Sequence, residues 1–365
     1  MADILVYDKD MTAAGVFDVQ LSQIWERRYY EAGYFELHLP QTDHYNTLMD
    51  RAVFLLRADA SEGGVITYVN KRVNERGNAE ITLIGRFLSY LFEWRPVHAG
   101  AGNYSDRNAE WLMRHLVEVN VMDETRGGYL PNVRLGELCG SEKVIKNIRI
   151  SGGKTLHAVL SEIAHMTGIG FRLRAAPAEN LLYFECLEGL DKSVGQSDNP
   201  RVIFSPDYDT IRGKAEYTED DSVTCNVVAM RYSGELGTVT VRYNPDNVTG
   251  LELREKVFTT DQCAVGPDGQ LDIRATENLL KYMARDHIHA VKREMNVSAA
   301  YSGTYVYKRD YDIGDIVTVQ SNPYGITMRR RIHKITENYT DAGKQIIPLF
   351  GAVNPAGEDK EDIDE

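Results

Sequence analysis

The stretch from Ser22 to Pro40 constrains the fold of this chain more than any other part of the sequence. Apolar and polar residues alternate from Tyr34 to Leu39, which is the period of a strand with one buried and one wetter face. The same alternation runs from Trp25 to Tyr29, and Pro40 ends the second strand because proline cannot donate to a sheet. Between the strands we expect Gly33 to take the positive φ of a bulged hairpin turn. The stretch predicts an aromatic-rich hairpin of the kind that begins a β-barrel.

The first part of the chain, residues 1–97, is predicted to be a small all-β domain. Further strands are expected at residues 4–8, 53–57, 65–73 and 81–84, and residues up to 50 link the hairpin to them without a helix. Several short strands separated by glycine-bearing turns are typical of a barrel or a sandwich. We expect this first barrel to close near Arg95-Pro96.

Residues 98–195 are predicted to form an α+β domain. A helix capped by Ser105 or Asp106 is expected to run to about Asn120. A second amphipathic helix is expected from Thr155 to Thr167, where Gly168 ends it in the usual C-terminal role. Strands at residues 171–173 and 181–187 can pack on this helix.

Residues 196–351 are predicted to form a second β-barrel domain with a helical insertion. Its strands are expected at about 222–245, as a hairpin of residues 226–232 and 238–243, and at 297–351. The insertion spans about residues 250–296 and contains a helix that Asp272 caps and that runs to about Arg293. The acidic end of the sequence, residues 352–365, is predicted to be a disordered tail.

Two distant segments of the sequence repeat one pattern. Residues 64–67 and 325–328 each follow a short apolar strand, and each leads through a second strand and a polar glycine turn to a return strand. The offset is 261 residues at the first glycine of the pattern and 266 at the last, Gly85 and Gly351. The repeat predicts a β-rich α+β fold in which two similar small β-barrel domains flank an α+β region.

The charge balance restricts the partners of the chain. With 54 acidic and 41 basic residues the formal charge is −13, so its long-range field has the wrong sign for a binder that relies on phosphate neutralisation. The clearest local cluster of positive charge is Arg329-Arg330-Arg331, and we interpret it as a solvated strand edge or a donor of salt bridges between subunits. No apolar run approaches the ~20 residues of a membrane helix, and the N-terminus lacks the pattern of a signal peptide.

Candidate metal and phosphate sites in the sequence fit simpler interpretations. Gly152-Gly153-Lys154-Thr155 resembles the end of a phosphate loop, but Ile148 stands where that loop needs glycine, so we expect a helix cap. His287 and His289 are two residues apart on an expected helix and therefore point to different faces. Two acidic groups also lack the spacing of a calcium loop: Asp207 with Asp209, and Glu219-Asp220-Asp221. We predict no metal, cofactor or catalytic residue.

Other candidate chemistry is equally sparse. The four cysteines, which lie far apart and suit neither a zinc site nor a disulfide scaffold, are expected to be free: Cys139, Cys186, Cys225 and Cys263. If Cys139 or Cys186 were a nucleophile, it would need a histidine from a distant part of the sequence. A pair of carboxylates for glycan hydrolysis stays an open alternative, because the distance between two carboxylates in the fold cannot be read from the sequence. Four aromatic residues offer surfaces for sugars but are expected in the core or a subunit interface: Trp25, Tyr29, Tyr30 and Tyr34.

The order of several short motifs resembles a known family. The motifs, spread over roughly residues 1–351, are Trp25, Arg28-Tyr29-Tyr30-Glu31-Ala32-Gly33, Phe35-Glu36-Leu37, Leu39-Pro40, Gly168-Ile169-Gly170-Phe171, Val202-Ile203-Phe204-Ser205, Asp310 to Val317, and Leu349-Phe350-Gly351. In this order they resemble the siphophage tail-tip hub proteins, also called tail-associated proteins, which are akin to the baseplate hubs of contractile phages.

The resemblance implies a structural role in a virion. Such hubs use two related barrels per chain, so that a homotrimer imitates a six-fold ring and adapts the tail tube to a three-fold spike or fibre. The implied partners are tail-tube or distal-tail and baseplate ring proteins, a tape-measure protein, and a central spike or tail fibre. DNA would only pass through the lumen, no membrane insertion is expected, and assembly would take place in the bacterial cytoplasm. The alternative is a cell-wall-active or glycan-binding tail protein.

Overall fold

The computed structural model describes residues 2–73, 77–208, 210, 215–222, 224–266, 268–285, 287–288, 292–297 and 304–353. The chain divides into two compact units: unit 1 comprises Met1–Ala215 with Asn296–Glu365, and unit 2 comprises Glu216–Met295. The fold is a strand-dominated α+β fold, as predicted. No helix within the described residues combines the length and the apolarity needed to cross a membrane.

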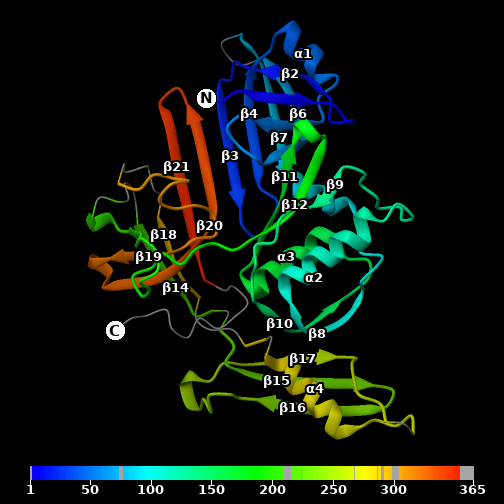
Figure 1. The fold of residues 1–365 in the computed structure, drawn as a ribbon. Coiled ribbons are helices and arrows are strands. Elements are labelled where there is room, and N and C mark those ends of the chain that lie inside the picture. The colour runs from blue at the N-terminus through cyan, green and yellow to red at the C-terminus, as the bar shows by residue number, and fades with distance from the viewer. Residues whose placement is uncertain are drawn as a thin grey trace. The chain divides into compact units, whose positions relative to one another are not determined.

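One large sheet forms the centre of unit 1 (Figure 1). Its eleven strands are β1 (Ile4–Tyr7), β2 (Ala13–Phe17), β3 (Ser22–Arg28), β4 (Tyr34–Pro40), β5 (Phe54–Arg57), β6 (Gly63–Val73), β7 (Ala79–Phe87), β13 (Ile203–Phe204), β19 (Ile316–Ser321), β20 (Ile326–Thr340) and β21 (Gly343–Gly351). They follow the order β13-β19-β20-β3-β4-β7-β6-β5-β1-β2, and β21 pairs with β20 off this path. The two predicted barrels therefore share a continuous sheet, and the described strands do not close into a barrel.

The predicted hairpin of β3 and β4 is confirmed. The strands are antiparallel, with Trp25 opposite Phe35, and both side chains are fully buried in a core that Leu37 and Leu39 complete. The prediction for Gly33 is wrong, because this glycine does not have a positive φ. A Cβ atom at Gly33 would lie 2.5 Å from the carbonyl oxygen of Glu26, so close approach is what requires glycine here.

The first part of the sheet contains a helix that the sequence analysis did not predict. Helix α1 (Asp43–Met49) lies in the expected linker and begins at Thr42, whose hydroxyl accepts a hydrogen bond from the backbone of Tyr45. Tyr45 and Leu48 bury its inner face against the core. Tertiary packing thus stabilises a helix that is too short to be stable by itself.

The middle of unit 1 is the predicted α+β region. It contains β8 (Gly102–Asn108), α2 (Ala109–Val117), β9 (Val133–Leu135), β10 (Val144–Ile150), α3 (Leu156–Thr167), β11 (Gly170–Ala176) and β12 (Leu181–Leu187). Helix α3 begins at Thr155 and ends at Gly168, whose φ is +68°, so both predicted ends are confirmed. Helix α2 begins two or three residues later than the caps expected at Asp106 or Ser105, because residues 102–108 pair with β10 as a strand and Asn108 provides the cap.

The repeat in the sequence corresponds to matching strand registers. Phe54 on β5 lies opposite Val65 on β6, and Ile316 on β19 lies opposite Arg331 on β20. A one-residue bulge follows in both pairs of long strands, at Thr67 between β6 and β7 and at His333 between β20 and β21. Equivalent positions of the repeat in β6 and β20 therefore differ by 266 in residue number, as Thr67 and His333 do.

The register also corrects the sequence alignment of the repeat. The predicted match of Gly64 with Gly325 is wrong, since Gly64 occupies the place of Arg330. Gly325 instead ends a short turn before β20 with a φ of +64°. We call β5–β7 the first meander and β19–β21 the second meander.

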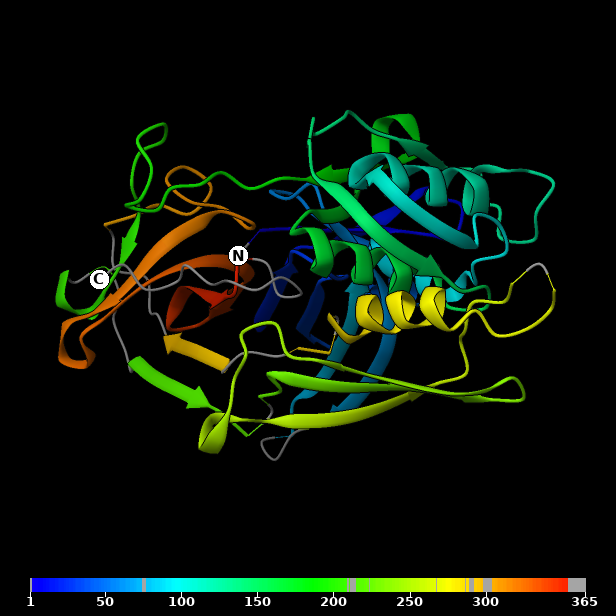
Figure 2. The same ribbon diagram turned by 90° about the horizontal axis from the view of Figure 1, so that it is seen from below.

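Unit 2 has a sheet of its own. Strands β15 (Val227–Gly234), β16 (Gly237–Tyr243) and β17 (Glu255–Thr260) form it, and α4 (Ile273–Arg285) packs on β15 and β16 (Figure 2). The hairpin of β15 and β16 and the Asp272 cap of α4 are confirmed. The structure differs in assigning that hairpin to unit 2 and not to the second barrel, because β15 pairs with β17 instead of a strand of the large sheet. The other predicted domain boundaries stay predictions.

Two more strands lie where the chain enters and leaves unit 2. These are β14 (Ala215–Asp220) and β18 (Lys292–Val297), which pair with each other in a two-stranded sheet. Helix α4 therefore ends eight residues before the expected Arg293, and a strand occupies the end of its predicted range. The predicted acidic tail beyond Val353 lies outside the described residues.

Candidate functional site

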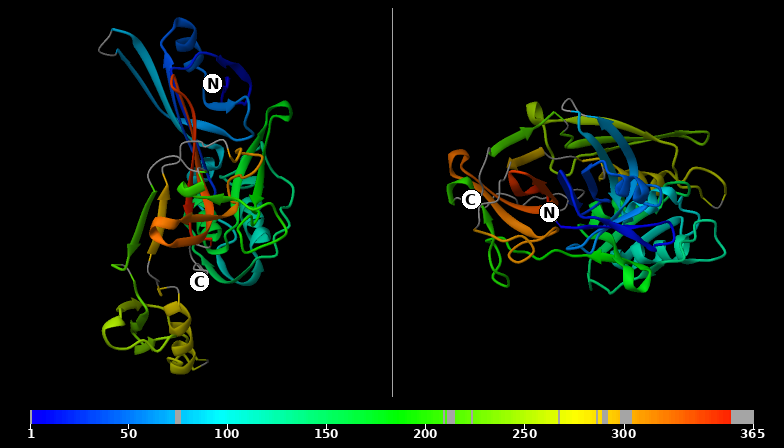
Figure 3. Two further views of the ribbon diagram at one scale, coloured as in Figure 1. Left: turned by 90° about the vertical axis from the view of Figure 1, so that its left-hand side faces the viewer. Right: turned by 90° about the horizontal axis from the view of Figure 1, so that it is seen from above.

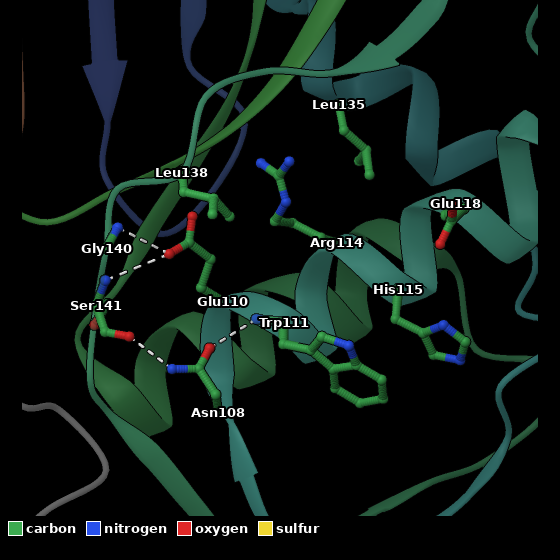
Figure 4. Close-up of a pocket in the computed structure, with 10 residues that line it drawn as sticks. All are labelled: Asn108, Glu110, Trp111, Arg114, His115, Glu118, Leu135, Leu138, Gly140 and Ser141. Carbon is green, nitrogen blue, oxygen red and sulfur yellow. Dashed lines mark hydrogen bonds between the residues drawn. The ribbon is translucent and has the colours of Figure 1, made fainter.

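A surface hollow of about 430 Å³ beside α2 is a candidate site in the described part of the chain (Figure 4). One wall is the exposed face of α2, and the other is the loop of residues 136–141 that follows β9. Sequence analysis did not single out this place. Its residues come from segments that have no shared motif and meet only in the folded chain.

Glu110 holds the loop against the helix. Its carboxylate accepts hydrogen bonds from the backbone amides of Cys139, Gly140 and Ser141 at 2.7, 3.0 and 3.3 Å. The Glu110 side chain is buried, so these three donors replace the water that the charge would otherwise bind. This carboxylate is therefore engaged in fixing backbone.

Two further polar side chains of the hollow serve the same purpose. Arg114 donates to the carbonyl oxygens of Glu137 and Gly136 at 3.2 and 2.9 Å. Asn108 caps α2 through its side-chain oxygen and donates from its amide nitrogen to the carbonyl oxygen of Ser141 at 2.6 Å. The hollow is thus a recess in which the side chains of Glu110, Arg114 and Asn108 already have partners.

The open side of the hollow is aromatic and apolar. Trp111 is 47% exposed and stacks on His115, with ring centroids 5.0 Å apart and planes 7° apart. Leu138 on the facing loop is 69% exposed. Burial raises the pKa of the Cys139 thiol to about 11, which is the opposite of an activated nucleophile. The arrangement suits contact with another chain better than it suits covalent chemistry.

A chain of ion pairs centred on the buried Arg27 and Glu62 joins the large sheet to the α+β region. Arg27 on β3 donates twice to one oxygen of Glu62, at 3.0 and 2.9 Å, and once to Asp312. Arg172 on β11 also contacts Glu62, at 3.4 Å, and both Arg172 and Arg174 bind Glu185 on β12. Because all these groups have partners, the chain of ion pairs holds the two parts of unit 1 in a fixed relation.

The pKa of Glu62 reflects these partners. Burial alone would raise the pKa of this carboxyl, but the guanidinium groups of Arg27 and Arg172 outweigh burial and hold the pKa below its usual value. Glu62 lies between the strands expected at residues 53–57 and 65–73, where only a glycine-bearing turn was predicted. A buried arginine on the apolar side of β3 is the one signal that a carboxylate had to lie near it.

The predicted metal and phosphate candidates have structural roles. Thr155 caps α3, as expected, and Lys154 pairs with Glu162 at 2.7 Å. His287 lies beyond the end of α4 and stacks on Phe258 with ring centroids 3.9 Å apart, so its predicted place on the helix is wrong. His289 lies outside the described residues.

The acidic candidates also have partners where the structure describes them. Asp207 accepts a hydrogen bond from the backbone of Asn322, and Asp221 pairs with Arg254, whereas Asp209 lies outside the described residues. Glu219 and Asp220 belong to β14. Within the described ranges, no group of three or more His, Cys, Asp or Glu side chains is arranged to hold a metal ion.

The remaining candidates are mostly in the core. Trp25, Tyr29 and Tyr30 are buried, as expected, and the partly buried Tyr34 donates to Glu36 at 2.6 Å. All four cysteines are free, as predicted, and burial raises the pKa of Cys186.

The interpretation of the arginine triplet is wrong for two of its members. Arg330 and Arg331 are buried, and Arg331 donates to the carbonyl oxygens of Gly314 and Val353 at 2.6 and 3.0 Å. Only Arg329, which pairs with Asp191 at 2.7 Å, lies on an open strand edge.

Comparisons with known proteins extend over the whole fold. The model of one family, described as Siphovirus ReqiPepy6 Gp37-like protein, matches residues 3–352. No curated protein matches the chain.

Three solved structures resemble the fold along nearly their whole length. The 43 kDa tail protein of prophage MuSo2 from Shewanella oneidensis has 12% identity and a TM-score of 0.57, covering 97% of this chain and 100% of that one. A tail protein from Neisseria meningitidis MC58 has 14% identity and a TM-score of 0.58, covering 98% and 99%. Prophage tail protein gp18 from Listeria monocytogenes EGD-e has 11% identity and a TM-score of 0.52, covering 96% and 94%. The predicted resemblance to phage tail proteins is confirmed.

Proposed function

We propose, from the premise that this chain belongs to the Siphovirus ReqiPepy6 Gp37-like protein family, that it is a structural hub at the distal end of a phage-type tail. The observation that carries the proposal is the shared fold with three tail proteins, two of them from prophages, over 96–98% of this chain. The likeness extends to 94–100% of each of those chains, so it concerns the whole architecture and not a shared module.

The hub acts as a homotrimer. Two meanders with the same register in one chain supply two similar modules, so that three copies present six. Such a ring meets a six-fold tube or a distal-tail or baseplate ring on one side and a three-fold spike or fibre on the other. A tape-measure protein would end at this ring, and the hub would be part of the virion at the tail tip.

The net charge supports this role. A formal charge of −13 lets DNA pass through a lumen without being held, because the field repels phosphate. The hub works by assembly and catalyses no reaction.

Co-expression tests the proposal. The chain is produced with the tail-tube or distal-tail ring protein of the same particle, and the mass of the complex is measured by native mass spectrometry. Three copies of the chain per ring are expected. A chain that stays monomeric both alone and with the ring protein would contradict the proposal.

A cell-wall activity makes a different prediction. Purified chain incubated with peptidoglycan or surface polysaccharide is expected to cause no turnover and to show no saturable binding. Trp25 and Tyr29 are buried and therefore offer no surface to a sugar. Release of soluble glycan fragments would favour the alternative.

A further inference from the structure

The second meander is covered on one side by a strand of the first part of the sheet. Residues Lys334–Tyr339 of β20 pair antiparallel with Arg28–Gln23 of β3. They lie directly after the bulge at His333, and on their other side they pair with β21. This junction makes the two parts of the large sheet continuous.

The equivalent edge of the first meander, on β6, is open. The register of the repeat places Tyr68–Val73 of β6 where Lys334–Tyr339 of β20 lie, directly after the bulge at Thr67. These six residues pair with β7 on one side, and on the other side they pair with no described strand, because β5 reaches only to Val65. Figure 3 shows the hairpin of β6 and β7 projecting from the rest of unit 1.

The open edge carries apolar side chains. Tyr68, Val69 and Val73 are 49%, 43% and 69% exposed. The two charged residues between them point to partners in their own chain, since Lys71 donates to Asn46 at 2.8 Å and Arg72 pairs with Glu80 at 3.3 Å. A long open edge with exposed apolar residues is a template for another strand.

The other edges of the described large sheet are protected. The edge strand β13 has two residues, and β2 has five and faces an irregular register on β1. Strand β21 carries Pro348, which cannot donate to an added strand. Short strands, irregular pairing, proline and charged side chains keep edges unpaired. The six residues of β6 beyond the bulge are long enough and regular enough to pair, they contain no proline, and the charges of Lys71 and Arg72 already have partners within the chain.

Chain order identifies the strand that would fit this edge. The antiparallel pair β3 and β4 precedes the first meander in the chain, and the pair β14 and β18, which forms a separate two-stranded sheet, precedes the second meander. Strand β14 therefore takes the place of β3, and its six residues equal the six of β3 that pair with β20.

We propose that the edge Tyr68–Val73 of β6 binds strand β14, Ala215–Asp220, of a second copy of this chain, antiparallel, as β20 binds β3 within one chain. The inference rests on the proposed function, because it names the contact through which the trimer closes. A head-to-tail contact repeated by rotation generates a closed ring, and here each new junction copies the one inside the chain. Centring the two six-residue strands places Asn70 opposite Thr218.

Mixing two cysteine variants tests the contact directly. Asn70→Cys and Thr218→Cys chains are purified separately, mixed, and oxidised mildly, and the products are separated on a non-reducing gel. A disulfide needs Cβ atoms about 3.8 Å apart, so a covalent dimer is expected only in the mixture. The unmodified chain and each variant alone control for the four native cysteines. Absence of the dimer from the mixture, while the mixed chains sediment as trimers, would overturn the inference.

A second set of variants keeps the outcome interpretable. Val69→Lys with Val73→Lys changes residues that are exposed in the single chain, and Val144→Lys is the matched control on β10, where the side chain is 47% exposed. The double variant is expected to raise the dissociation constant of the trimer about tenfold or more, and the control to leave it unchanged. If the trimer tolerates the double variant, the strand contact is wrong and the hub stands. If the unmodified chain is monomeric with and without its ring protein, the hub itself fails.

Discussion

Arg57 on β5 and Glu337 on β20 form a buried ion pair between the two parts of the large sheet. One guanidinium nitrogen donates to both carboxylate oxygens, at 2.9 and 3.0 Å, and the side chains are 0% and 1% exposed. The Arg57 guanidinium also lies 5.3 Å from the centre of the Trp25 ring. Residues 280 apart in number thus fix the junction at which the first part of the sheet meets the second.

Removing one partner of this pair should be costly. Glu337→Gln leaves the Arg57 charge buried with only Asp59 beside it, and we expect a loss of about 3 kcal/mol in the free energy of unfolding of unit 1. Urea unfolding measures the loss. The control is Glu162→Gln, whose pair with Lys154 is exposed at both side chains and should be worth less than about 1 kcal/mol. Equal effects of the two substitutions would contradict the assigned role of the pair.

The ion pairs around Glu62 predict a dependence on pH. The folded chain holds the pKa of Glu62 below its usual value. A group with a depressed folded pKa contributes stability that is complete above its unfolded pKa of about 4.3 and is lost as the pH falls through the folded pKa. The stability difference between the unmodified chain and Glu62→Gln should therefore be largest near neutral pH and shrink below about pH 4.

Urea midpoints of both chains at neutral and acidic pH measure this difference. The same comparison with Glu162→Gln should give a small difference at each pH, because that carboxylate is exposed. A Glu62→Gln difference that stays constant down to acidic pH would mean that Glu62 is not held ionised by Arg27 and Arg172.

Glu110 should control the loop of residues 136–141. Glu110→Ala removes the acceptor of the Cys139, Gly140 and Ser141 amides, so we expect hydrogen exchange at these amides to become at least ~tenfold faster. The control is Glu118→Ala, because Glu118 lines the same hollow but is not among the residues that hydrogen-bond to the loop. Unchanged exchange in Glu110→Ala would show that other contacts hold the loop.

Gly85 is expected to tolerate no side chain. A Cβ atom there would lie 2.1 Å from the carbonyl oxygen of Val65 and 2.3 Å from the Phe35 ring, so Gly85→Ala must displace backbone at the centre of the first meander. We expect a loss of about 3 kcal/mol or more, measured as a lower melting temperature or loss of soluble protein. Gly127→Ala, where a Cβ atom meets nothing within 4 Å, should change stability by less than about 1 kcal/mol.

Local patterns predicted the elements whose signals lie within a few residues. The alternation around Phe35 gave β4 its buried face, and Thr155 with Gly168 marked both ends of α3. The same reasoning missed α1, because a seven-residue helix depends on the packing of Tyr45 and Leu48. It also missed β8, whose residues are mostly polar and are defined by pairing with β10.

Relations between distant residues could not be predicted from local patterns. Arg331 looked like a surface residue within a charged triplet, yet it is buried over the Tyr29 ring and bonded to backbone. The repeat was visible as a pattern, but its alignment became clear only from the bulges at Thr67 and His333. The packing of Arg331 over the ring of Tyr29 and the exact pairing of backbone in the two hairpins decide these cases, and neither leaves a local pattern in the sequence.

Electron cryomicroscopy of the intact particle tests the central claim most directly. At the tail tip we predict a ring of three copies of this chain, in which first and second meanders alternate around six similar positions. The edge of β6 from Tyr68 to Val73 should be paired with a neighbouring copy in that ring. Six copies of the chain in a ring, or a position away from the tail tip, would contradict the account.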